Sequence, residues 1–217
     1  MPKAFILVVL LCACSSSAAP CLIPTWISRS QEVAFQGFTN GLGTPMMKGR
    51  LTFCWKFDAS KNSITFVLAA KNRGWIGFGV SAGGGMTNAD LAIFKKDPLG
   101  NNIVEDMFSK SSYHGPRLDR VQNVKLIGSY MTGVSEVFVH VFSRPIRTCG
   151  TWDVSLNTQG STEIITAFGK KLDYGLEFGE VRDVEAHLPG NRDTVKIDLF
   201  DGKPVDIPAE APGASCT

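Results

Sequence analysis

Short runs in which apolar and polar side chains alternate recur along most of the chain. Between Arg50 and Asp58 every second residue is apolar, which is the pattern of a half-buried strand. Between Ser63 and Lys71 both faces are apolar, which indicates a central strand. Such runs predict about nine strands, at residues 50–58, 63–71, 74–82, 89–94, 101–108, 121–129, 134–143, 162–168 and 195–200. Short strands at this spacing, without a long amphipathic helix, predict an all-β fold of two packed antiparallel sheets, a β-sandwich.

Two apolar runs around a glycine-rich turn, GWIGFGVSA and ADLAIF, form the most distinctive part of this pattern. The turn contains Gly83, Gly84 and Gly85 and presents one methionine, Met86. Because glycine has no Cβ, the backbone of such a turn can approach a bulky group closely. Met86 is therefore either a packed core side chain or a soft thioether ligand for a metal.

One late histidine, His187, is the candidate counterpart of Met86. It lies in a long, charged, glycine-containing loop, residues 169–193, and long loops inside compact domains are usually functional. The simpler interpretation is a solvated loop histidine. If the two residues meet, we expect them to come from two loops at one end of the sandwich. His140 shares a strand face with phenylalanines, which is typical of a hydrogen-bonded core histidine, and His114 lies in a polar loop.

Residues 1–19 have the pattern of a secretory signal peptide, with a positive start, an apolar run over residues 4–14 and small residues before the cleavage point. The alternative is a bacterial lipoprotein signal that ends at Cys14. The apolar run is too short to span a bilayer, and no later run is long and apolar enough to be a membrane helix. We therefore expect a secreted protein with a β-sandwich over residues 20–205 and a flexible tail over residues 206–217.

Four cysteines remain after the signal peptide: Cys21, Cys54, Cys149 and Cys216. An even number in a secreted chain favours two disulfides, for which three pairings are possible. Cys54 lies on the polar face of its strand, within reach of the N-terminal segment. The C-terminal tail can reach the connection that carries Cys149. We therefore favour the pairs Cys21–Cys54 and Cys149–Cys216.

Composition and charge narrow the classes of function. The chain has 217 residues, of which 44% are hydrophobic and 19% charged, as in an ordinary globular protein. A net charge of +2 gives no indication of a nucleic-acid partner. The chain has three histidines, and no Ser-His-Asp or Cys-His arrangement for nucleophilic catalysis stands out. No cysteine pair has zinc-ligand spacing, and no flavin-binding fingerprint is present. The sequence therefore does not indicate an independent catalyst.

Four motifs, in this order, resemble the DOMON domain: GWIGFGVSAGGGMTNAD, FSRPIRTCGTWD, IITAFG and AHLPGNRDTVKIDL. This domain is named for the N-terminal module of dopamine β-monooxygenase, and the resemblance covers residues 49–199. It implies an immunoglobulin-like β-sandwich. In the branch that includes the cellobiose dehydrogenase cytochrome domain and the auxin-responsive secreted cytochromes, the resemblance further implies haem b held between one methionine and one histidine. Met86 and His187 match these two ligands. Trp75 is expected in the core, and the alternative is that it covers the haem face.

The resemblance implies two classes of function. The first is a secreted b-type cytochrome that passes single electrons to or from a redox partner, either a membrane b-type cytochrome or a secreted oxidoreductase. A methionine and a histidine fill both axial positions of the iron, so such a centre transfers electrons and does not bind a substrate. The alternative is a haem-free DOMON module that binds a carbohydrate or another protein. The copper chemistry of the namesake is not expected, because its histidine-rich copper domain has no counterpart here.

Overall fold

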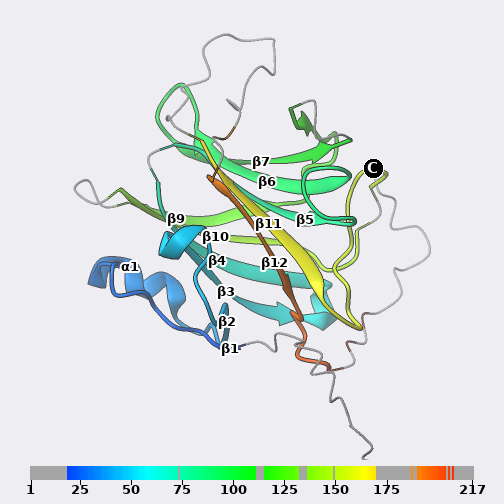
Figure 1. The fold of residues 1–217 in the computed structure, drawn as a ribbon, viewed down its shortest axis with the longest axis horizontal. Helices are drawn as coiled ribbons and strands as arrows, with labels where there is room; N and C mark the ends of the chain where they lie inside the picture. The colour runs from blue at the N-terminus through cyan, green and yellow to red at the C-terminus, as the bar shows by residue number, and fades with distance from the viewer. Residues whose placement is uncertain are drawn as a thin grey trace, which may run out of the picture.

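The computed structural model describes residues 19–72, 74–110, 115–131, 136–148, 150–169, 187, 190–203, 205 and 207. These residues form two six-stranded sheets in which every neighbouring pair of strands is antiparallel (Figure 1). Sheet A has the order β1 (Ala19–Pro20), β2 (Asn40–Gly41), β3 (Leu51–Asp58), β4 (Ser63–Lys71), β10 (Val137–Pro145) and β9 (Lys125–Met131). Sheet B has the order β12 (Arg192–Ile197), β11 (Thr162–Phe168), β5 (Ile76–Ser81), β6 (Ala89–Lys96), β7 (Asn102–Ser109) and β8 (Arg117–Leu118). The predicted two-sheet antiparallel sandwich is confirmed.

The alternation of side chains predicted most strands closely. β4 and β11 have the predicted bounds, and β4 is central, between β3 and β10. β9 and β10, which are consecutive in the chain, pair with each other in antiparallel fashion. Nine strands have six or more residues, and the two-residue strands β1, β2 and β8 were not predicted. β12 begins at Arg192, three residues before its predicted start. The apolar pattern did not include these first residues because they are polar and lie on an edge strand.

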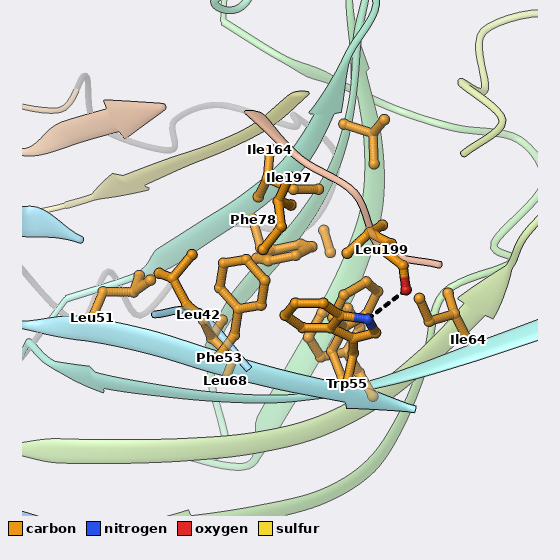
Figure 2. Packing of buried hydrophobic residues seen from close by; sticks show 14 of the residues in the cluster. Leu42, Leu51, Phe53, Trp55, Ile64, Leu68, Phe78, Ile164, Ile197 and Leu199 are labelled. Atoms are coloured by element: carbon orange, nitrogen blue, oxygen red, sulfur yellow. Dashed lines mark hydrogen bonds between the residues drawn. The ribbon is translucent and has the colours of Figure 1, made fainter. Parts of the chain in front are cut away.

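The core lies between the two sheets and is rich in aromatic side chains (Figure 2). Phe53 of β3 packs edge-on against Phe78 of β5, with ring centroids 5.2 Å apart, so aromatic contacts join the two sheets. The fully buried Trp55 of β3 donates its indole N–H to the Leu199 carbonyl at 2.7 Å. This bond satisfies the polar atom of the indole and ties the chain after β12 to sheet A.

The outer face of sheet A is covered by the N-terminal segment. This segment contains the short helix α1 (Arg29–Glu32) and the 3₁₀ turn η1 (Val33–Phe35), which the pattern of apolar residues did not predict. Two further 3₁₀ turns, η2 (Met47–Gly49) and η3 (Ala59–Lys61), flank β3. The predicted disulfide Cys21–Cys54 is confirmed, with the two Cα atoms 5.5 Å apart. Cys149 and Cys216 lie outside the described residues, so their pairing stays a prediction.

Ala19 belongs to β1, and the rest of the predicted signal peptide, residues 1–18, lies outside the described residues. Near the C-terminus, Ile207 is 4% exposed and packs in the core, so the packed part of the chain extends past the predicted boundary at residue 205. Among the helices in the described part of the chain, none is long and apolar enough to cross a membrane.

Candidate functional site

The turn between β5 and β6 presents Met86 at one end of sheet B. Gly84 and Gly85 have φ values of +86° and +71°, a conformation that side-chain-bearing residues adopt rarely, which explains the glycines predicted to matter here. Asn88 also has positive φ, and the Ala89 amide donates to the Met86 carbonyl at 3.3 Å. The Met86 side chain is half-buried. It is therefore held at the boundary between solvent and the sheet.

The outward side of sheet B beside this turn is apolar, and we call it the outer face of sheet B. β5 places Gly77 and Gly79 on this side. A Cβ on Gly79 would overlap Leu91 Cδ2 and would lie 3.1 Å from Ile165 Cγ1. Large side chains of the neighbouring strands therefore lean over the glycines and bury them. The face has the buried members Trp75, Ala89, Leu91, Ile93, Met107 and Ile165.

Polar groups line the margin of this face near Met86. The Ser81 hydroxyl is buried and finds no hydrogen-bond partner in the part of the chain that the structure describes. Ser81 lies opposite Glu163 of β11, and Glu163 Oε1 would be 3.1 Å from a Cβ on Gly84. Lys196 of β12 lies 3.7 Å from Glu163. A buried hydroxyl without a partner costs free energy, which makes Ser81 a candidate donor to a bound molecule.

Trp75 lies at the other end of the outer face of sheet B, beside Gly77. It is buried, as predicted for a core residue, and its carbonyl accepts hydrogen bonds from the Gly169 amide at 3.0 Å and from the Asn72 side chain at 3.0 Å. A Cβ on Gly169 would overlap the indole ring, so glycine is required there. The indole is thus fixed on the same face as the leucine and isoleucines.

The strand register places the Met86 turn and the start of β12 at opposite ends of sheet B. Ser81, at the Met86 end of β5, pairs with Glu163, whereas Ala167 pairs with both Gly77 and Arg192 at the far end. In Figure 1, β12 accordingly starts at the upper left and the β5–β6 turn lies at the right. The expectation that the Met86 and His187 segments share one end is therefore corrected. The reason is the antiparallel pairing of β5 with β11, which sequence alone does not reveal.

His187 is half-buried and lies five residues before Arg192 in the chain. The turn that carries Met86 and the start of β12, which follows His187, thus lie at the two ends of sheet B. In the described residues, no three or more His, Cys, Asp or Glu side chains come together in a way that would hold a metal ion.

His140 occupies the core between the sheets, as predicted, and not the outer face of sheet B. Its ring stacks on Phe94 with centroids 4.7 Å apart, and its Nδ1 lies 2.9 Å from the Ser129 hydroxyl. Burial, with a smaller contribution from the positive charge of Lys96, lowers the pKa of His140 to about 3. His140 is therefore a neutral, hydrogen-bonded packing residue. His114 lies outside the described residues.

Behind the Met86 turn lies a group of buried charges that the sequence analysis missed. Asp90 of β6 forms an ion pair with Arg144 of β10, at 2.9 Å. Nearby, Asp106 accepts the Asn123 and Val124 amides at 2.9 and 3.2 Å. Burial, followed by the negative charge of Asp90, raises the pKa of Asp106 to about 7. The signal that points to such groups is a charged residue within an apolar strand, as in ADLAIF.

Comparison with known proteins finds a matching domain family and similar longer proteins. The family model of the DOMON domain matches residues 47–169, more than half of the chain. The chain is 28% identical over 118 residues to "Putative DBH-like monooxygenase protein 2" of Homo sapiens, and the match covers 53% of this chain and 22% of that protein. It is 30% identical over 110 residues to "DBH-like monooxygenase protein 1" of Gallus gallus, covering 51% of this chain and 17% of that protein. The matches therefore span about a fifth of these longer proteins.

Solved structures with a similar fold include two cytochrome domains. The cytochrome b domain of pyranose dehydrogenase from Coprinopsis cinerea superposes with a TM-score of 0.53 at 16% identity, covering 77% of this chain and 85% of that chain. The cytochrome domain of Myriococcum thermophilum cellobiose dehydrogenase gives a TM-score of 0.51 at 16% identity, covering 76% and 85%. At this identity the likeness establishes a shared fold.

Proposed function

The chain belongs to the DOMON family, and on this premise we propose that it is a secreted b-type cytochrome that binds haem b on the outer face of sheet B. The observation that carries the proposal is an apolar, glycine-containing sheet face with Met86 at one end and the start of β12, five residues after His187, at the other. A porphyrin is largely apolar, so this face has the chemistry to bind it.

Met86 and His187 would hold the haem iron through a thioether and an imidazole. The β5–β6 turn that carries Met86 and the start of β12, which follows His187, lie at opposite ends of sheet B. The strand from Gly77 to Ser81 covers about 13 Å. The five residues from His187 to Arg192 span at most about 17 Å when extended. His187 can therefore lie over the outer face of sheet B, between its two ends.

The polar margin of the face also suits haem, which carries two carboxylate groups. Ser81 offers a buried hydroxyl without a partner among the described residues. Arg192 and Lys196 lie on β12 at the margin and supply positive charge. Trp75, fixed against Gly169, contributes apolar cover at the far end. These residues would bind and orient the group, and the two ligands would exclude water from the iron.

When bound, haem with both axial positions filled supplies reversible one-electron transfer. The fold that this chain shares with two cytochrome domains supports this role. The Cys21–Cys54 disulfide supports an oxidising location such as the extracellular space. We propose a redox protein as the partner, either a membrane b-type cytochrome or a secreted oxidoreductase.

The proposal is tested by adding haem b to the purified protein and recording the visible spectrum. We expect a Soret band with low-spin features in the wild type. His187→Ala should lose haem or become high-spin, and Met86→Leu should lose the low-spin features because the thioether is absent. The matched controls are His114→Ala and Met131→Leu, the latter an exposed methionine on the edge strand of sheet A. Both should keep the wild-type spectrum.

Two results would contradict the proposal. If the spectrum survives both Met86→Leu and His187→Ala unchanged, the ligands lie elsewhere. If no Soret band forms in the wild type, the haem-free module that binds a carbohydrate or a protein becomes the better description. Titration with oligosaccharides would then be the next measurement.

A further inference from the structure

The buried ion pair behind the Met86 turn is part of a closed ring of hydrogen bonds. Arg144 Nη2 donates to Asp90 Oδ2 at 2.9 Å and to the Val154 carbonyl at 2.7 Å. The Val154 amide donates back to Asp90 Oδ2 at 3.0 Å. The Asp90 and Arg144 side chains are each 4% exposed. The ring therefore joins β6, β10 and the connection after β10 at one point inside the sandwich.

This ring lies next to the residues that fix Met86. Asp90 directly follows Ala89, whose amide donates to the Met86 carbonyl. On the other side of Met86, Gly84 lies near Glu163, whose Oε1 would be 3.1 Å from a Cβ on that glycine, whereas Gly83 and Gly85 have no atoms near a potential Cβ. The short path from Met86 to Asp90 is thus a direct connection between the thioether and the buried ion pair.

The nature of the pair indicates more than a contribution to stability. Two buried charges lose hydration, and replacing such a pair with apolar side chains is often neutral or stabilising. Charge-assisted hydrogen bonds, in contrast, fix distances and directions that apolar contacts leave adjustable. An ion pair that bridges the two sheets at the base of a functional turn is therefore well suited to hold that turn at a set position.

We propose that Asp90 and Arg144 are positioning residues for Met86, holding the β5–β6 turn so that the thioether faces the outer face of sheet B. The purpose of this anchor rests on the haem-binding function proposed above. The anchor itself is a property of the protein without haem, so the two ideas can fail separately.

The test compares an apolar replacement of this pair with the same replacement of another pair on β6. The test variant is Asp90→Leu with Arg144→Met. The control is Lys95→Met with Glu105→Leu, which removes the 2.7 Å ion pair at the opposite end of β6. Hydrogen exchange of the Ala89 amide is measured by NMR in the haem-free proteins, and the spectrum is then recorded after haem addition.

We expect exchange of the Ala89 amide to accelerate at least tenfold in the test variant and to stay unchanged in the control. Amides of β3 and β4 should keep their wild-type exchange in both. With haem added, the test variant should lose part of the low-spin signal, while the control keeps it. Arg144→Lys, which keeps the charge but not the planar pair of donors, should fall between them and serves if the double variant does not fold.

The anchor by Asp90 and Arg144 and the haem-binding function would be contradicted by different results. If Ala89 exchange is unchanged in the test variant, or accelerates together with that of β3 and β4, the pair is only structural and the proposal is overturned. If Ala89 exchange accelerates alone but the wild type forms no Soret band, the anchor is supported and the haem-binding function is refuted.

Discussion

The outer faces of the two sheets are both apolar, but they are built differently. On sheet A, the β-branched Val67, Val139 and Val141 project outward, and the N-terminal segment packs over them. On sheet B, the central strand β5 has Gly77 and Gly79 at the equivalent positions, and neighbouring side chains lie across them. The valines give the covering segment of sheet A a large surface to pack against, whereas the glycines of sheet B leave room for the large side chains of the neighbouring strands. Under the haem-binding proposal, the second arrangement is the one that would receive the ligand.

The largest effect is expected from a variant that shortens a side chain of the segment packed over sheet A. Phe35 of η1 is 4% exposed and packs in the cluster over the valines. Phe35→Ala should lower the free energy of unfolding by about 3–5 kcal/mol, measured by urea denaturation. The control is Val33→Ala in the same turn, where a side chain that is 49% exposed should change it by less than about 0.5 kcal/mol. Equal effects would mean that η1 is not part of the folded core. The spectrum with haem should not change in either variant, because the other sheet is untouched.

A smaller loss of stability is expected on sheet B when a side chain is added at a glycine of β5. A Cβ at Gly79 would overlap Leu91 and would lie 2.9 Å from the Asp90 carbonyl, which belongs to the backbone and cannot swing away. Gly79→Ala should therefore destabilise the protein by about 1–3 kcal/mol, as overpacking does. Gly83→Ala, where a Cβ meets open space, is the control and should have little effect. A stabilising Gly79→Ala would show that the neighbours do not lean over β5.

The smallest effect concerns pH and the charges behind sheet B. In the folded chain the pKa of Asp106 is raised from 3.8 to about 7, so the folded state keeps a proton that the unfolded state releases. The stability from this group is present at low pH and is lost as the pH rises through 7. From pH 6 to pH 8 the loss is about 1.4 kcal/mol.

The measurement for Asp106 is a difference between two proteins. His140 has the opposite sign, since its lowered pKa means that stability falls as the pH drops below 6.5. Asp106→Asn keeps an acceptor for the two amides and cannot titrate, while His140 is common to both proteins. The free energy of unfolding is measured by urea denaturation at pH 6 and pH 8. Relative to the wild type, the variant should be more stable at pH 8 than at pH 6. A pH-independent difference would mean that Asp106 is charged throughout this range.

The sequence predicted the strands well where burial follows a simple period. β4 and β11 were placed correctly because their alternation or continuous apolarity leaves one interpretation. The helix α1 was missed, although Ser28 and Gln31 have the spacing of a capping box and form it in the structure. Its four residues are too few to show a helical period.

The candidate site was predicted in part. The glycines before Met86 indicated a special turn, and the positive φ values of Gly84 and Gly85 agree with that. The relation of this turn to the His187 segment was not predictable, because it depends on β11 pairing with β5. The Asp90–Arg144 pair joins β6 to β10, and only the packing of the two sheets brings these residues together.

The order of strands within each sheet has a further consequence for how the chain folds. β4 pairs with β10, and β5 pairs with β11, so the centre of each sheet joins segments that are far apart in the sequence. Proteins dominated by such non-local pairings fold in milliseconds to seconds, because long loops close before the pairing compensates for their lost entropy. During synthesis, β4 is completed well before β10. Until β10 is made, one edge of the strongly apolar β4 has no strand to pair with. In this interval aggregation competes most directly with folding.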